Sequence, residues 1–311
     1  MIEPVFSECL SLKKGESFSS WISRVAVAND VTLYKLWSMA GGVSGPGDGS
    51  RAYPDYPTTP AVLKGVAALV GLTWTMSTKV FVRQLAHFSD SLRYRAIAYD
   101  PRGQGLTSKT VEGHSYQQHG RDLEALVRAL QLKRIVLVGW SFGVLDAMAY
   151  LDQFGVDNVR ALVILDGTPK PRGGDPATEW VESEEGRRWG IITPIEDRAQ
   201  FHHKFGQWLL EDASPKNVEW ITEISAQTSA TVTALLNETA RHVDYESLLI
   251  DVIKQLPVLI VAREEWRRQV SSWLKANGPA VPLVVMGKHM MFWERADAFN
   301  VELDAFLDSL G

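Results

Sequence analysis

The 311-residue sequence contains a single cysteine, Cys9, and no excess of basic residues. One cysteine cannot form an intramolecular disulfide and cannot supply a multi-cysteine zinc site. Lysine and arginine together number 32 against 37 aspartates and glutamates, which gives a formal net charge of −5. This charge balance, without a local basic run, predicts no nucleic-acid partner.

Long apolar runs are absent from the sequence as well. No stretch approaches the roughly 18 uninterrupted apolar residues that a membrane-spanning helix needs, so we expect no membrane span. The first residues, Met1 to Pro4, lack the basic and then apolar pattern of a secretory signal. We therefore expect a cytoplasmic protein. The 45% hydrophobic and 22% charged residues are typical of a globular protein and exclude collagen-like and disordered classes.

Six short apolar segments alternate with stretches of helical periodicity from residue 66 onward. They cover 66–72, 93–99, 134–139, 159–165, 257–262 and 281–286. Strands that alternate with amphipathic helices are typical of a parallel sheet covered on both faces. The sequence therefore predicts an α/β fold with a mostly parallel sheet.

One long segment interrupts the alternation. Residues 168–250 are largely helix-forming, contain no convincing strand, and hold Trp180, Trp189, Trp208 and Trp220. We interpret this segment as a helical cap inserted into a core formed by residues 1–167 and 251–311.

Two features near the N-terminus also have a local interpretation. Residues 25–27 and 31–34 flank Asn29-Asp30, a pattern that predicts an antiparallel hairpin. Glycines and prolines are concentrated in residues 41–61, which predicts an exposed loop.

The strongest chemical signal is Gly139-Trp140-Ser141-Phe142-Gly143, a G-x-S-x-G motif. An apolar strand segment runs directly into it and a helical segment follows, which is the context of a nucleophile elbow. The glycines let strand and helix pass closely, and the turn exposes the Ser141 hydroxyl at the end of the sheet. Ser141 is therefore the candidate nucleophile.

A base must accept the serine proton, and histidine suits this because it titrates near neutrality. His289 follows the last predicted strand, so its loop lies at the same carboxyl edge of the sheet as Ser141. The other six histidines fit less well. His114 and His119, for example, flank the start of a helix, where surface or capping roles are expected.

The third member, an acid that orients the imidazole, has two candidate positions. Asp166 ends the 159–165 segment, and Glu264-Glu265 follow the 257–262 segment. The residues alone leave both positions open.

These motifs resemble those of the α/β-hydrolases, and the resemblance covers about residues 24–310. It rests on the motif around Ser141, on Tyr99-Asp100-Pro101-Arg102-Gly103-Gln104-Gly105, and on Gly287-Lys288-His289-Met290. The candidates also follow the family's chain order of serine, acid and histidine. Within the family, the chain is most similar to small bacterial esterases and to the cofactor-free non-haem chloroperoxidases.

The chain departs from the family pattern at the acid. Family members often carry an aspartate where this chain has Trp266, but some place it after the strand that precedes the cap. The resemblance therefore favours Asp166 over Glu264 and Glu265.

A second departure concerns the oxyanion hole, where the family's His-Gly is missing from residues 70–76. The backbone N–H of Phe142 is expected to be one donor. Alignment from Phe81 places Trp74 in the second donor position, and alignment from Gly71 places Leu72 there instead. A backbone donor works with either side chain.

The resemblance implies a serine hydrolase that cleaves carboxylic esters or lactones through an acyl-enzyme, with no metal or organic cofactor. We expect a small apolar ester-like substrate, with the four tryptophans of 168–250 and the Met290-Met291-Phe292-Trp293 run lining an apolar pocket. The alternatives are a cofactor-free oxygenase or perhydrolase on the same fold and a non-catalytic ligand-binding protein. The sequence does not indicate whether the protein is a monomer or an oligomer.

Overall fold

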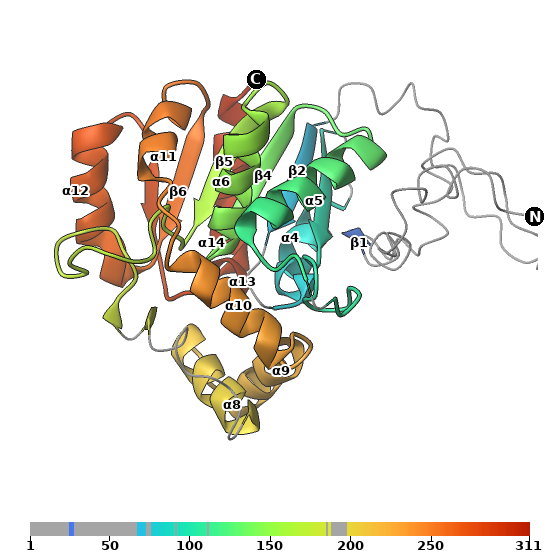
Figure 1. Ribbon diagram of the computed structural model, residues 1–311. Coiled ribbons are helices and arrows are strands. Elements are labelled where there is room, and N and C mark those ends of the chain that lie inside the picture. The colour runs from blue at the N-terminus through green and yellow to red at the C-terminus, as the bar shows by residue number, and fades with distance from the viewer. Residues whose placement is uncertain are drawn as a thin grey trace, which may run out of the picture.

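A computed structural model describes residues 25–27, 67–72, 76–89, 91, 93–110, 112–184, 186–187 and 198–311 of the chain. Its centre is a seven-stranded sheet of order β1-β3-β2-β4-β5-β6-β7 (Figure 1). Strand β1 is antiparallel to β3, and the other six strands are parallel. The strands are β1 (Val25–Val27), β2 (Ala67–Leu72), β3 (Tyr94–Tyr99), β4 (Ile135–Trp140), β5 (Val159–Leu165), β6 (Val258–Ala262) and β7 (Leu283–Val285).

Helices cover both faces of this sheet. The helices with described bounds are η1 (Thr78–Phe81), α4 (Val82–His87), α5 (Tyr116–Ala129), α6 (Gly143–Phe154), α8 (Arg198–Leu209), α9 (Pro215–Ser225), α10 (Ala230–Ala240), α11 (Glu246–Val252), η2 (Glu264–Trp266), α12 (Arg267–Asn277), α13 (Met291–Glu294) and α14 (Ala296–Ser309), and not all of them lie on a face of the sheet. Helices α4 and α14 pack on one face, where the Gln84 amide donates to Asn300 Oδ1 at 3.2 Å. Helices α5, α6 and α11 pack together on the other face.

The predicted α/β fold with a mostly parallel sheet is confirmed. Each of the six predicted apolar segments contains a strand that begins within two residues of its predicted start. Every residue of β4 is buried, as expected for a central strand covered on both faces. Strand β1 pairs with β3, whereas 31–34, the predicted partner of 25–27, and the loop 41–61 lie outside the described residues.

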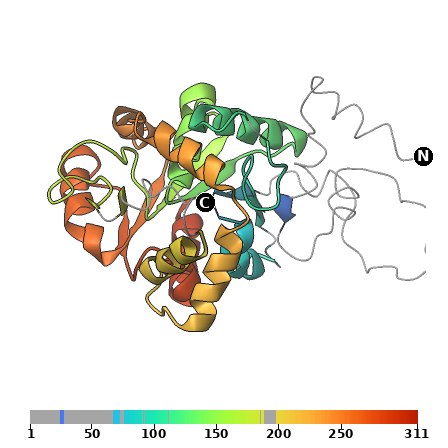
Figure 2. The ribbon, with the colours of Figure 1, turned by 60° about the horizontal axis from the view of Figure 1, so that its bottom comes forward.

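Helices α8 to α11 lie between β5 and β6 in the chain. Figure 1 shows α8, α9 and α10 beyond the edge of the sheet where α13 lies, and Figure 2 shows the same helices in front of the strands. Helix α11 differs from them because it packs against α6 on the face of the sheet. The predicted boundary at residue 250 falls within α11.

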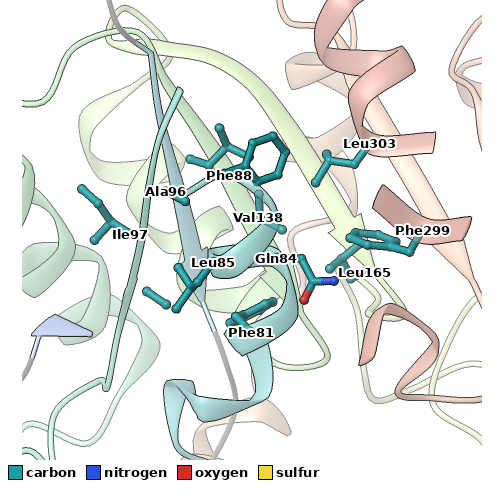
Figure 3. Close-up of a pocket in the computed structure, with 13 residues that line it drawn as sticks. Phe81, Gln84, Leu85, Phe88, Ala96, Ile97, Val138, Leu165, Phe299 and Leu303 are labelled. Atoms are coloured by element: carbon teal, nitrogen blue, oxygen red, sulfur yellow. The ribbon is translucent and has the colours of Figure 1, made fainter. Parts of the chain in front are cut away.

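A small interior cavity of about 30 Å³ lies between the sheet and helices α4 and α14 (Figure 3). Apolar side chains such as Phe81, Phe88 and Phe299 line it, and Gln84 is the one polar side chain among its described lining residues. The Gln84 amide already donates to the Phe292 carbonyl at 2.6 Å. A cavity this small and apolar is a packing gap and leaves no room for a substrate.

His119 does not have the surface or capping role expected from the sequence. The cap of α5 is Ser115, whose hydroxyl accepts from the Gln118 amide at 3.2 Å. His119 instead points inward, and its Nδ1 lies 2.8 Å from Asp146 Oδ1 on α6. Burial lowers the pKa of His119, but the Asp146 carboxylate raises it more, so the net shift is upward. The reason is helical spacing: His119, Leu123 and Leu126 share one buried face.

This pair predicts a pH-dependent stability. A raised histidine pKa stabilises the fold below about pH 6.5, and the contribution is lost as the pH rises through the folded-state value. The double variant His119→Gln/Asp146→Asn replaces the pair by two amides and should flatten the fall in unfolding free energy as the pH rises above about 6.5. Urea unfolding at several pH values measures this effect.

The matched control is His242→Gln/Glu238→Gln, which removes an exposed pair with a 3.4 Å contact. It should leave the pH slope unchanged. An equal slope in the wild type and in the buried-pair variant would show that His119 and Asp146 do not couple folding to pH.

Candidate active site

The turn that carries Ser141 joins the end of β4 to the start of α6. Ser141 has φ of +54°, in the left-handed region that costs energy for a residue with a side chain. The turn is held because the Ser141 amide donates to the Leu165 carbonyl at 2.9 Å. A Cβ on Gly139 would lie 2.7 Å from the Cα of Val144, so only glycine lets strand and helix approach this closely. The local geometry is that of a nucleophile elbow.

The structure brings Ser141, His289 and Asp166 together although they are far apart in the sequence. The Ser141 hydroxyl lies 3.0 Å from Nε2 of His289, within reach to donate a hydrogen bond. The other ring nitrogen, Nδ1, hydrogen-bonds to Asp166 Oδ2. All three side chains are at least 95% buried. The arrangement permits a proton to move from the hydroxyl to Nε2 while the carboxylate faces Nδ1.

Two tryptophan rings contact the His289 ring. The rings of Trp140 and Trp208 each lie 5.2 Å from it, centroid to centroid. Trp140 also donates from Nε1 to the backbone carbonyl of His289 at 2.9 Å, which ties the histidine loop to the end of β4. Trp208 approaches from α8. The motif position of Trp140 and the tryptophan content of 168–250 were visible in the sequence, but neither contact with His289 was predicted.

Asp166 follows β5 directly and has φ of +39°. Its amide donates to the Val261 carbonyl at 2.7 Å, which fixes it beside the end of β6. Burial raises the pKa of the Asp166 carboxyl, but the charge of Arg263 and the hydrogen bond from His289 lower it more. This pKa therefore lies below the ordinary aspartate value, and the carboxylate stays ionised at neutral pH.

Arg263, the first residue after β6, is a member of the cluster that the sequence analysis missed. Its amide donates to Asp166 Oδ1 at 2.9 Å, and its Nη1 donates to Asp166 Oδ2 at 2.8 Å. The guanidinium is buried and lies 3.8 Å from the Trp266 ring centroid. Two further carboxylates lie near the guanidinium: Glu265 is 3.2 Å from Nε, and Glu182 is 3.9 Å from Nη2. Burial raises the pKa of Glu182. The sequence did place an arginine directly after a predicted buried strand. A charged residue at such a position is rarely buried without a partner, and this could have indicated its role.

The two alternative acids do not reach His289. Glu264 pairs with Arg267 at 2.8 Å, and both side chains are exposed. Glu265 pairs with Nε of Arg263 at 3.2 Å, and its own side chain is 70% exposed. The structure therefore places Asp166, and neither glutamate, against the imidazole.

Of the three candidate oxyanion donors, Phe142 and Leu72 are among the described residues and Trp74 is not. Phe142 is the N-cap residue of α6, so its backbone N–H is at the positive end of that helix. Leu72 ends β2 and pairs in register with Gly139, which places its backbone beside the strand that leads to Ser141. Trp74, the other candidate, lies outside the described residues.

The aromatic and methionine residues expected to line a pocket do not all lie at the site. Trp208 contacts the triad, as described above. Met290, Met291 and Phe292 are fully buried in the core, and Phe292 packs against Phe81 with ring centroids 5.2 Å apart. The pocket prediction is wrong for these three residues because the histidine loop turns them inward. Other members pack in pairs or lie outside: Trp220 stacks on Trp293, Trp180 packs on Trp273, and Trp189 is not described.

The described residues contain neither a membrane-spanning helix nor a cluster of metal ligands. No helix in these parts of the chain has the length and apolar character needed to cross a membrane. Within the same residues, no three histidine, cysteine, aspartate or glutamate side chains are grouped so that they could hold a metal ion.

Parts of this chain are similar to known proteins. Residues 69–190 match a family model described as the alpha/beta hydrolase fold. A non-heme haloperoxidase of Rhodococcus erythropolis is 30% identical over 132 residues, which are 42% of this chain and 47% of the relative. The 3-oxoadipate enol-lactonase 2 of Acinetobacter baylyi is 30% identical over 184 residues, 58% of this chain and 64% of the relative. The chain thus aligns with less than two thirds of the length of either relative.

A solved structure extends the likeness over most of the chain. The esterase EaEST from Exiguobacterium antarcticum superposes with a TM-score of 0.68 at 20% identity, covering 78% of this chain and 92% of the esterase. At that identity the likeness shows the fold alone. The family model and the structural neighbour both show that this chain has the alpha/beta hydrolase fold, as the resemblance of its motifs implied.

Proposed function

We propose that the protein is a serine hydrolase that cleaves carboxylic esters, including lactones, through an acyl-enzyme. The observation that carries the proposal is the buried chain of contacts from Ser141 Oγ through His289 to Asp166 Oδ2 at the carboxyl edge of the sheet. A serine hydroxyl is a weak nucleophile until an adjacent base accepts its proton. His289 is placed to be that base, and Asp166 to hold it in the required tautomer.

In the first half of the reaction, Ser141 Oγ attacks the substrate carbonyl carbon while its proton moves to His289 Nε2. The carbonyl oxygen becomes an oxyanion, which the Phe142 N–H and a second backbone donor from residues 72–74 stabilise. The tetrahedral intermediate then collapses. The bond to the alcohol oxygen breaks, this oxygen takes the proton from Nε2, and the acyl group remains on Ser141.

In the second half, a water molecule attacks the acyl carbon and gives one proton to His289 Nε2. The Ser141–acyl bond breaks, Oγ recovers the proton, and the carboxylic acid leaves. For a lactone the alcohol and the acid are two ends of one product. The charge of Asp166 stabilises the imidazolium that forms in each half, so the low pKa of this carboxyl suits the cycle.

We propose further that residues 168–250 act as a cap over this site and that the substrate is a small apolar ester. Trp208 supports this proposal, since α8 lies in that segment and the Trp208 ring covers His289. Excluding water around the triad strengthens the electrostatic interactions within it. The names of the relatives, an enol-lactonase and an esterase, are consistent with ester and lactone substrates.

A second candidate activity is perhydrolysis, favoured by the name of one relative, a bifunctional esterase/perhydrolase of Acinetobacter calcoaceticus. Hydrogen peroxide would attack the acyl-enzyme in place of water and release a peracid, with the same proton transfers through His289. A peroxide-dependent rise in peracid formation from an ester would distinguish this activity from plain hydrolysis.

The nucleophile assignment predicts labelling by a fluorophosphonate probe. The wild type should lose its ester hydrolysis as the probe bonds to Ser141, and Ser141→Ala should neither react nor turn over ester. The matched control is Ser271→Ala, which changes an exposed serine on α12 and should behave as the wild type. Labelling of Ser141→Ala at the wild-type rate would refute the assignment, and a wild type that binds esters without turnover would favour the binding-protein alternative.

The acid assignment predicts a large effect for one of three carboxylates. Asp166→Asn keeps the shape of the side chain but favours the wrong imidazole tautomer, so kcat should fall on the order of 10³- to 10⁴-fold with a smaller loss of stability. Glu264→Gln and Glu265→Gln are the matched controls and should each stay within about threefold of the wild type. Steady-state kinetics and thermal unfolding of the three variants measure both effects. A larger loss of kcat in either glutamine variant would move the role away from Asp166.

A further inference from the structure

We infer that Arg263 is a positioning residue of the catalytic triad: its guanidinium fixes the Asp166 carboxylate against His289 and opposes the charging of the imidazole. This inference rests on the proposed serine hydrolase function. Arg263 contacts Asp166 and His289 and acts through them, so it is not itself a catalytic residue.

The first argument is the way the carboxylate is held. Arg263 supplies two donors to Asp166, the backbone amide to Oδ1 and Nη1 to Oδ2. Oδ2 is also the oxygen that faces His289 Nδ1. Rotating the carboxylate would break the contact with Nη1 and the contact with Nδ1 together. The arginine therefore fixes the orientation that the imidazole requires.

The guanidinium of Arg263 is itself buried and closely packed. It is 97% buried, packs over the Trp266 ring at 3.8 Å, and receives a carboxylate contact from Glu265 at Nε. Burying a charge is costly unless it is paired, and a buried ion pair often stabilises a fold no better than apolar residues of similar size. A structural role alone thus gives little reason for an arginine at this position.

The charge of the Arg263 guanidinium also acts on the His289 ring. Nη1 of Arg263 lies 3.3 Å from Nδ1 of His289, so a positive charge stands beside the ring that becomes positive during the reaction. The groups that face this arginine are Asp166 after β5, Glu182 in the segment that follows, Glu265 in η2, and the uncharged Trp208 ring of α8. Without the guanidinium, the ring would face the Asp166 and Glu182 carboxylates with no positive charge beside it.

The experiment compares Arg263→Gln and Arg263→Lys with the wild type. It measures kcat and KM for an ester, and the rate of fluorophosphonate reaction from pH 5 to 9. For Arg263→Gln we expect kcat to fall by about 10- to 100-fold with KM within about threefold, because the carboxylate loses its fixed orientation. In the plot of fluorophosphonate reaction rate against pH, the acid limb is the rise on the low-pH side. This limb should move upward by about one pH unit in Arg263→Gln, because the guanidinium charge beside the His289 ring is gone.

Arg263→Lys keeps the charge but loses the planar fork of donors. Its acid limb should stay at the wild-type position while kcat falls several-fold. The matched control is Arg267→Gln, which removes an exposed arginine paired with Glu264 and should change neither quantity. Thermal unfolding of each variant separates these effects from a loss of folded protein.

The outcomes separate this inference from the function on which it rests. A wild type that does not react with the probe at Ser141 would overturn the serine hydrolase proposal. A reactive wild type with an unmoved acid limb in Arg263→Gln would overturn only the role of Arg263. If Arg263→Gln does not fold, the lysine variant decides, since wild-type kcat in Arg263→Lys would contradict the positioning role.

Discussion

The site depends on the hydrogen bonds that align the ends of three neighbouring parallel strands. The Ser141 amide donates to Leu165 at the end of β5, and the Asp166 amide donates to Val261 near the end of β6. Each bond fixes the first residue beyond one strand against the next strand. Because parallel strands end at one edge of a sheet, Ser141, Asp166 and Arg263 follow one another along this edge. The histidine loop after β7 then brings His289 back over the same edge.

Burial of the triad makes its charges interdependent. An ionised carboxylate with almost no exposed surface requires compensation, and here the guanidinium of Arg263 supplies it together with two hydrogen bonds. The same positive charge lies beside the imidazole, so one side chain influences both the acid and the base. Trp140, Trp208 and Trp266 surround these groups and keep them away from solvent. The electrostatics of the proposed reaction therefore depend on residues around the triad as well as on Asp166.

Much of this arrangement could be predicted from the sequence, because strands and the elbow have local signals. The apolar segments located six strands, and G-x-S-x-G between strand and helix identified the turn at Ser141. The residues alone left Asp166 and the two glutamates open, since the choice depends on side-chain direction at strand ends. The roles of Arg263 and His119 were not predicted, because each depends on a partner more than 20 positions away in the sequence. Met290 and Phe292 were misassigned because apolar residues beside a catalytic loop serve the core as readily as a pocket.

A crystal structure of the protein after reaction with a small fluorophosphonate tests the central claim most directly. The account predicts phosphorus bonded to Ser141 Oγ, with the phosphoryl oxygen about 3 Å from the Phe142 N–H. It also predicts His289 Nδ1 against Asp166 Oδ2 in the same crystal. Phosphorus on another residue, or Glu264 or Glu265 in contact with His289, would contradict the account.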